Sequence, residues 1–145
     1  MWRCAVKKDD GFTFVETLAV LAIMLILAAG VGIAADRYIR KARVVAARSQ
    51  IEVYALALQS YYMDCGMYPS EEQGLEALWK KPDFFPVPQN WDGPYVDREI
   101  QADPWGNAYV YSRLVQVGVP FEITSLGSDG CEGGEGDAAD IVSWK

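Results

Sequence analysis

The chain has 145 residues, enough for one ordinary domain with a small core and a terminal appendage. It carries 13 basic and 20 acidic residues, for a formal net charge of −7, which argues against a basic face for nucleic acid. No histidine is present, which removes the commonest general base and argues against an enzyme, so no catalytic residue is predicted.

Residues 17–35 form an uncharged run of 19 positions. At about 1.5 Å per helical residue, this run approaches the roughly 30 Å hydrocarbon core of a membrane. A secretory signal peptide is the alternative, with basic residues near the start and small residues that resemble cleavage sites (Arg3, Lys7, Lys8, 28–30 and 34–35). Because the run is longer than the apolar region of such a peptide, a membrane-spanning helix is favoured.

After Asp36 the apolar residues follow a helical period, with spacings of three, four and three. This stripe predicts a helix that buries one face. Its members are Ile51, Tyr54, Leu58 and Tyr61. We therefore expect one unbroken helix from about Thr13 to Asp64, ended by Gly66 and Pro69.

The remaining chain predicts short elements. Ser70 and Gln73 form a capping-box pattern that begins a second helix, which we expect to reach about Lys80. A loop rich in proline and a turn follow, at 82–94 and 103–107. Three β-branched and aromatic segments predict strands at 108–112, 120–125 and 140–144, with a hairpin at Gly118 and Pro120. The expected fold class is α+β, a long N-terminal helix packed on a small antiparallel β-sheet.

The segment G-F-T-F-V-E, from Gly11 to Glu16, follows a short polar leader and enters the apolar helix. It resembles the processing signal of type IV pilins and pseudopilins. Further segments resemble, in order, the major pseudopilins of type II secretion systems; they are 68–78, 93–95, 103–107, 125–130 and 133–141. The resemblance implies that a prepilin peptidase cuts after Gly11 and that Phe12 becomes the N-methylated first residue.

That resemblance divides the chain into three parts. Residues 1–11 are the leader, residues 12–35 the transmembrane and filament-core helix, and residues 36–145 a periplasmic pilin-like head. The basic residues flanking the apolar run number three before it and five after it, at positions 37–48. By the positive-inside rule alone the head would be cytoplasmic, whereas the resemblance implies an inner-membrane protein with a periplasmic head.

Glu16 is an isolated carboxylate at the start of the apolar segment. Such a group is costly in hydrocarbon unless a partner neutralises it. Cleavage before Phe12 creates an α-amine four residues away, and this amine can meet Glu16 within one chain or between subunits, fixing their register. The other interpretation is that Glu16 marks the membrane interface and is solvated.

A glycine-rich acidic loop lies near the C-terminus. Its carboxylates are Asp129, Glu132, Glu135, Asp137 and Asp140. Calcium prefers such oxygen ligands, but the EF-hand pattern does not fit, and spacing alone slightly favours a solvated loop. The family resemblance implies a calcium site, with ligands Asp129, Asp137, Asp140 and the carbonyl of Leu126.

The three cysteines, Cys4, Cys65 and Cys131, form no zinc-binding spacing. If Cys4 is removed with the leader, the other two remain as a candidate disulfide for an oxidising compartment, and such a bond would tie the acidic loop to the end of the long helix. Two buried free thiols are the other interpretation.

By resemblance, the leading hypothesis is a structural subunit of the type II secretion pseudopilus, which polymerises through its N-terminal helix to drive export of folded periplasmic proteins. Its implied partners are further copies of itself, minor pseudopilins, the prepilin peptidase and the inner-membrane secretion platform. A type IV pilin for adhesion or DNA uptake is the first alternative. A membrane-anchored calcium-binding domain that never polymerises is the second.

Overall fold

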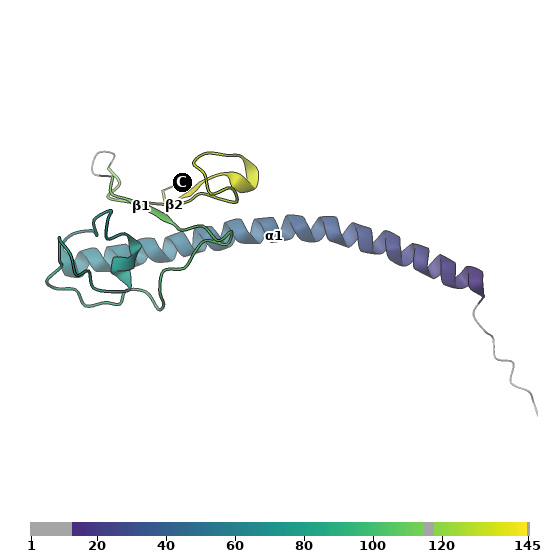
Figure 1. The fold of residues 1–145 in the computed structure, drawn as a ribbon, viewed down its shortest axis with the longest axis horizontal. Coiled ribbons are helices and arrows are strands. Elements are labelled where there is room, and N and C mark those ends of the chain that lie inside the picture. Colours follow the sequence, from purple (N-terminus) through teal and green to yellow (C-terminus); the bar gives the residue numbers. More distant parts are fainter. Residues whose placement is uncertain (1–12, 115–117, 145) are drawn as a thin grey trace, which may run out of the picture. The chain divides into compact units, whose positions relative to one another are not determined.

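The computed structural model describes residues 13–114 and 118–144, without the side chains of residues 30–34. The described elements are α1 (Phe14–Cys65), η1 (Leu75–Leu78), β1 (Val110–Ser112), β2 (Glu122–Ser125), η2 (Gly136–Ala138) and β3 (Ile141–Val142). The α+β class, with a long N-terminal helix and a small antiparallel sheet, is confirmed (Figure 1). By internal contacts the chain divides into two units, residues 1–39 and 40–145.

Helix α1 has 52 residues and begins and ends within one residue of the predicted bounds. At its start the hydroxyl of Thr13 accepts a hydrogen bond from the Glu16 amide at 3.3 Å, an N-terminal cap. At its end Gly66 has φ of 71°, and its amide donates to the Tyr62 carbonyl at 2.8 Å. Glycine adopts this left-handed conformation without strain, which explains the stop.

The described helical residues of the first unit are all exposed, including large apolar side chains such as Phe14 (78 %) and Leu25 (72 %). No helix within the described residues has the combined length and apolarity expected of a membrane-spanning segment. Phe12 and the side chains of 30–34, which belong to the predicted span 12–35, lie outside the described residues.

The core of the second unit is built on the predicted stripe of α1. Ile51, Tyr54, Leu58 and Tyr61 are each 2 % exposed or less. They share one hydrophobic cluster with side chains from η1 and the sheet, namely Leu75, Leu78, Tyr111 and Ile123. The stripe is therefore confirmed as the buried face of the helix, and β1 and β2 lie beside this part of α1 (Figure 1).

The sheet is antiparallel in the order β1-β2-β3, with Tyr111 opposite Ile123 and Thr124 opposite Val142. All three strands are shorter than predicted, at three, four and two residues. Part of the connection between β1 and β2, residues 115–117, lies outside the described residues.

The capping box at Ser70 is confirmed. The Gln73 amide donates to the Ser70 hydroxyl at 3.2 Å, and the Ser70 amide donates to the Gln73 side chain at 3.1 Å. The expected α-helix to Lys80 is wrong, because only the 3-10 helix η1 forms. Gly74, with φ of 57°, interrupts helical geometry directly after the box.

Candidate functional site

The predicted processing and assembly residues lie at the N-terminus. Gly11 and Phe12 fall outside the described residues. Glu16 is exposed in the first turn of α1, where a carboxylate interacts favourably with the helix dipole. The pairing of Glu16 with the amine of residue 12 therefore remains a prediction.

The acidic loop closes on itself through backbone contacts. The Ser128 amide donates to the Asp137 carbonyl at 3.0 Å. At Gly127, where φ is 65°, an added Cβ would lie 2.9 Å from the same carbonyl oxygen. A Cβ at Gly134 would collide with the carbonyl oxygen of Ala138. Glycine is required at both positions because the two sides of the loop approach so closely.

The four predicted calcium ligands have different surroundings. Asp129 is exposed, and its Oδ1 accepts a hydrogen bond from the Cys131 amide at 3.2 Å. Asp137 forms an ion pair with Arg40, with 3.1 Å between Oδ2 and Nε. Asp140 Oδ2 accepts the Gly133 amide at 2.9 Å. Leu126 is half-buried at the end of β2, where the loop begins.

One oxygen of Asp140 fits a cation. Oδ1 is buried and has no hydrogen-bond partner, and a buried carboxylate oxygen is costly without one. Across the described ranges, however, no group of three or more Asp, Glu, Cys or His side chains is placed to hold a metal ion. The described residues thus offer one unsatisfied carboxylate oxygen and not an assembled carboxylate cage.

The base of the loop is held by residues of the segment 103–107, for which the sequence predicts only a turn. The Asn107 side chain donates to the Gly127 carbonyl at 2.8 Å. Asp103 is buried and accepts the Ser125 hydroxyl at 2.6 Å and the amides of Trp105 and Asn107 at 3.0 and 2.8 Å. The buried Asp103 carboxylate thus accepts three hydrogen bonds, two from the turn and one from β2, and so anchors the turn to β2. The signal in the sequence was the Asp residue that opens the turn, whose type commonly accepts nearby backbone amides.

The predicted disulfide is absent, because Cys65 and Cys131 are both free thiols. The Cys65 sulfur is half-buried and lies 3.9 Å from the Tyr95 hydroxyl, and burial raises the pKa of this thiol. Cys131 is exposed in the acidic loop, so the alternative of two buried thiols is also wrong. The physical reason is that Cys65 faces the aromatic side chains at the end of α1, where burial also raises the pKa of Tyr61 to about 12.

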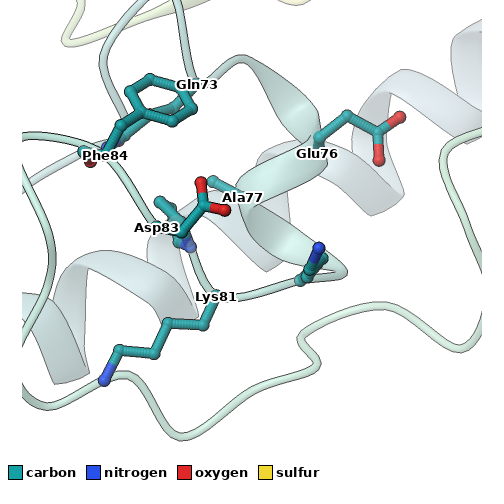
Figure 2. Close-up of a pocket in the computed structure, with 8 residues that line it drawn as sticks. Gln73, Glu76, Ala77, Lys81, Asp83 and Phe84 are labelled. Carbon is teal, nitrogen blue, oxygen red and sulfur yellow. The ribbon is translucent and has the colours of Figure 1, made fainter.

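A pocket of about 130 Å³ lies beside η1, and its lining includes the charged side chains Glu76, Lys80, Lys81 and Asp83. Figure 2 shows that Glu76, Lys81 and Asp83 do not converge on a common point and that Lys81 extends away from the pocket. General acid–base chemistry needs groups within hydrogen-bonding reach of one another or of a substrate. This pocket presents no such arrangement.

An exposed apolar helix joined to a small α+β unit, without a converging set of reactive groups in the described residues, is the arrangement of a pilin-like assembly subunit. Comparisons with known proteins narrow this class. Residues 36–144 match the family model described as type II secretion system protein G, and residues 6–32 match that of the prokaryotic N-terminal methylation motif.

Individual relatives from bacteria support the same family. The type II secretion system core protein G of Pseudomonas aeruginosa is 42 % identical over 138 residues, covering 95 % of this chain and 96 % of that protein. The protein of the same name from Vibrio cholerae is 40 % identical over 141 residues, covering 95 % and 93 %. The crystal structure of the major pseudopilin from enterohaemorrhagic Escherichia coli superposes with a TM-score of 0.61 at 35 % identity, covering 72 % of this chain and 88 % of that one.

The chain belongs to the protein G family of type II secretion systems, the major pseudopilins. It is a structural subunit of a pseudopilus and not an enzyme. The prediction of a pseudopilin is confirmed, and the alternative of an adhesive or DNA-uptake type IV pilin is not favoured.

Proposed function

We propose that the chain is made as a precursor, cut after Gly11, methylated at Phe12 and held in the bacterial inner membrane by residues 12–35. The head, residues 36–145, is periplasmic. Subunits then leave the membrane and polymerise through α1, and the growing pseudopilus drives folded proteins across the outer membrane. The observation that carries this proposal is the N-terminal methylation motif at 6–32, which continues into exposed apolar residues of α1.

The exchange of lipid for protein is physically reasonable for this helix. Large apolar side chains in the first segment of α1, residues 14–39, are exposed. Burial of this surface in lipid or among neighbouring helices removes it from water, which is favourable by roughly 25 cal/mol per Å² of apolar surface. Lipid tails and neighbouring helices are both apolar, so the transfer between them does not depend on a hydrophobic driving force. Packing and the pairing of Glu16 with the α-amine of residue 12 then decide which state is favoured.

The partners follow from the same proposal. They are further copies of this chain, minor pseudopilins, the prepilin peptidase and the secretion platform of the inner membrane. The support is the membership of the family, because a major pseudopilin works inside a secretion system.

Two measurements in cells test this proposal. Mass analysis of the mature N-terminus is expected to find methylated Phe12; a start after residue 30 would instead indicate a secretory signal peptide. Crosslinking is expected to give a ladder of oligomers, whose absence would favour an anchored domain that never polymerises.

The orientation can be tested with the native exposed thiol. A membrane-impermeant maleimide should label Cys131 in cells whose outer membrane has been permeabilised, and Cys131→Ser should remove that label. Labelling that requires lysis of the inner membrane would place the head in the cytoplasm, as the basic flank alone indicates.

We propose secondly that the acidic loop binds calcium through Asp140, Asp129, Asp137 and the Leu126 carbonyl. Support comes from Asp140 Oδ1, which is buried and unsatisfied, and from the carboxylates of the same loop, which are the ligand type that calcium prefers. Bound calcium would supply positive charge to these oxygens. Binding requires Asp137 to exchange its ion pair with Arg40 for the cation.

Calcium that binds only the folded chain stabilises it by about 2.7 kcal/mol at a hundredfold excess over the dissociation constant. The thermal midpoint of the detergent-solubilised chain is expected to fall with chelator, and Asp140→Ala should remove this response. Glu132→Gln, an exposed loop carboxylate, is the matched control. An equal midpoint in calcium and in chelator would rule out the site.

A further inference from the structure

The charge of this chain is segregated along α1. Residues 36–48 contain five basic residues and one acidic residue, whereas residues 49–145 contain five basic and sixteen acidic residues. The five basic residues of 36–48 are all exposed on α1, and we call them the basic belt. They are Arg37, Arg40, Lys41, Arg43 and Arg48. The proposed assembly gives this belt no role.

The belt also opposes the proposed orientation. It follows the apolar segment on the side of the head and outnumbers the three basic residues of the leader. Basic residues close to an apolar segment favour the cytoplasmic side. If the head is periplasmic, we expect an interaction on that side to offset this preference.

The geometry of the belt matches the polar layer of a bilayer. Residues 37–43 rise about 9 Å along the helix at 1.5 Å per residue, similar to one headgroup layer of about 5 to 8 Å. At about 100° per residue, positions 37, 40, 41 and 43 fall within an arc of about 160° around the axis, so these charges share one side of the helix. Tyr38, 72 % exposed in the same turn, is the type of residue that favours this interface.

Most charges of the belt are available for a ligand. Arg40 is paired with Asp137 at 3.1 Å. Within the part of the chain that the structure describes, no ion pair involves Arg37, Lys41 or Arg43. These three side chains are long enough to reach phosphate groups while their stems cover apolar surface.

We propose that the basic belt binds the headgroups of anionic phospholipids at the periplasmic face of the inner membrane and so holds the subunit at a fixed depth before assembly. This inference rests on the membrane location proposed above. Each basic residue near an anionic surface strengthens attraction about fivefold, and the attraction is screened by salt. The net charge of −7 predicts the opposite, repulsion from such lipids, so a preference for them would have to arise locally.

The test reconstitutes the full chain in an equimolar mixture of phosphatidylglycerol and phosphatidylcholine. The protein is then extracted in mild detergent, and mass spectrometry gives the ratio of the two lipids that remain bound. We expect at least about a fivefold enrichment of phosphatidylglycerol at low salt, and a ratio near one at about 1 M salt, where the Debye length is only about 3 Å.

Two variants with the same loss of charge make the test specific. Arg37→Gln/Lys41→Gln/Arg43→Gln should lower the enrichment at least about fivefold. Lys80→Gln/Lys81→Gln/Arg98→Gln removes three exposed charges elsewhere in the head and should leave the enrichment unchanged. Enrichment that survives in the first variant, or falls equally in both, overturns the inference.

Carbonate extraction of the same vesicles separates this inference from the proposed function. A chain that resists extraction without enriching phosphatidylglycerol retains the membrane location and loses the lipid site. A chain that is extracted from every vesicle loses both. If the first variant keeps its lipids but loses its crosslinking ladder in cells, the belt instead contacts acidic groups of another subunit, which also contradicts the inference.

Discussion

Residues 14–39 and residues 40–65 belong to the same helix, yet their apolar side chains have different surroundings. In the second segment one stripe is buried against η1 and the sheet, with Leu58 at 0 % exposure. In the first segment the described side chains are exposed on every side of the helix, with Phe14 at 78 %. A helix that is apolar all round needs lipid or other helices as its surroundings, whereas an amphipathic helix needs only one covering layer.

The comparison separates folding from assembly. Mutations in the buried stripe of the second segment should act on the stability of the head, because these side chains contact the core. Mutations in the first segment should act on assembly and leave the head unchanged.

Glu16→Ala should abolish filament formation and leave both membrane insertion and the stability of the head unchanged. The carboxylate is exposed at the start of α1, so no contact of the head is lost. Its proposed partner is the amine of residue 12 in the same or a neighbouring subunit. Crosslinking and electron microscopy of sheared filaments measure assembly. Normal filaments from this mutant would show that the carboxylate is not required for assembly.

Leu58→Ala should destabilise the head by about 2 to 5 kcal/mol, because the side chain is fully buried and its removal leaves a cavity. Leu56→Ala is the matched control in the same turns of α1. Leu56 is 64 % exposed, so its truncation should change the free energy of unfolding by less than about 0.5 kcal/mol. Urea denaturation of the detergent-solubilised chain measures both, and equal losses would contradict the division of the helix into two faces.

The sequence predicted the parts of the fold that depend on periodicity. The stripe from Ile51 to Tyr61 repeats every three or four residues, and that spacing alone identified the buried face. The second helix was predicted incorrectly because Gly74 has a positive φ that a helical pattern does not reveal. Short strands were overextended, since their ends depend on pairing partners far away in the chain.

The candidate sites were less predictable, because they depend on contacts between distant residues. The number and spacing of the cysteines do not reveal that Cys65 lies against Tyr95 while Cys131 is exposed. The pairing of Asp137 with Arg40, almost a hundred positions away, was likewise invisible. The turn at Asp103 was recognised from composition, but its hydrogen bond to Ser125 was not.

Asp103→Ala should therefore destabilise the head by about 1 to 3 kcal/mol, although the sequence around Asp103 predicts only an ordinary turn. The mutation leaves the buried Ser125 hydroxyl and two backbone amides without their acceptor. Asp97→Ala, an exposed carboxylate in the preceding loop, is the control and should have little effect. Urea denaturation measures the difference, and amide hydrogen exchange should localise it to residues 103–107 and the adjoining loop.

Arg40→Gln should have the smallest effect, although Arg40 is the first residue of the second unit and joins α1 to the acidic loop through Asp137. Both side chains are partly exposed, at 46 % and 37 %, and ion pairs of this kind contribute about 0 to 1 kcal/mol. The free energy of unfolding should fall by no more than that, and less at high salt. A loss comparable to that of Leu58→Ala would mean that the charge contact, and not the buried stripe, holds this end of the head to the helix.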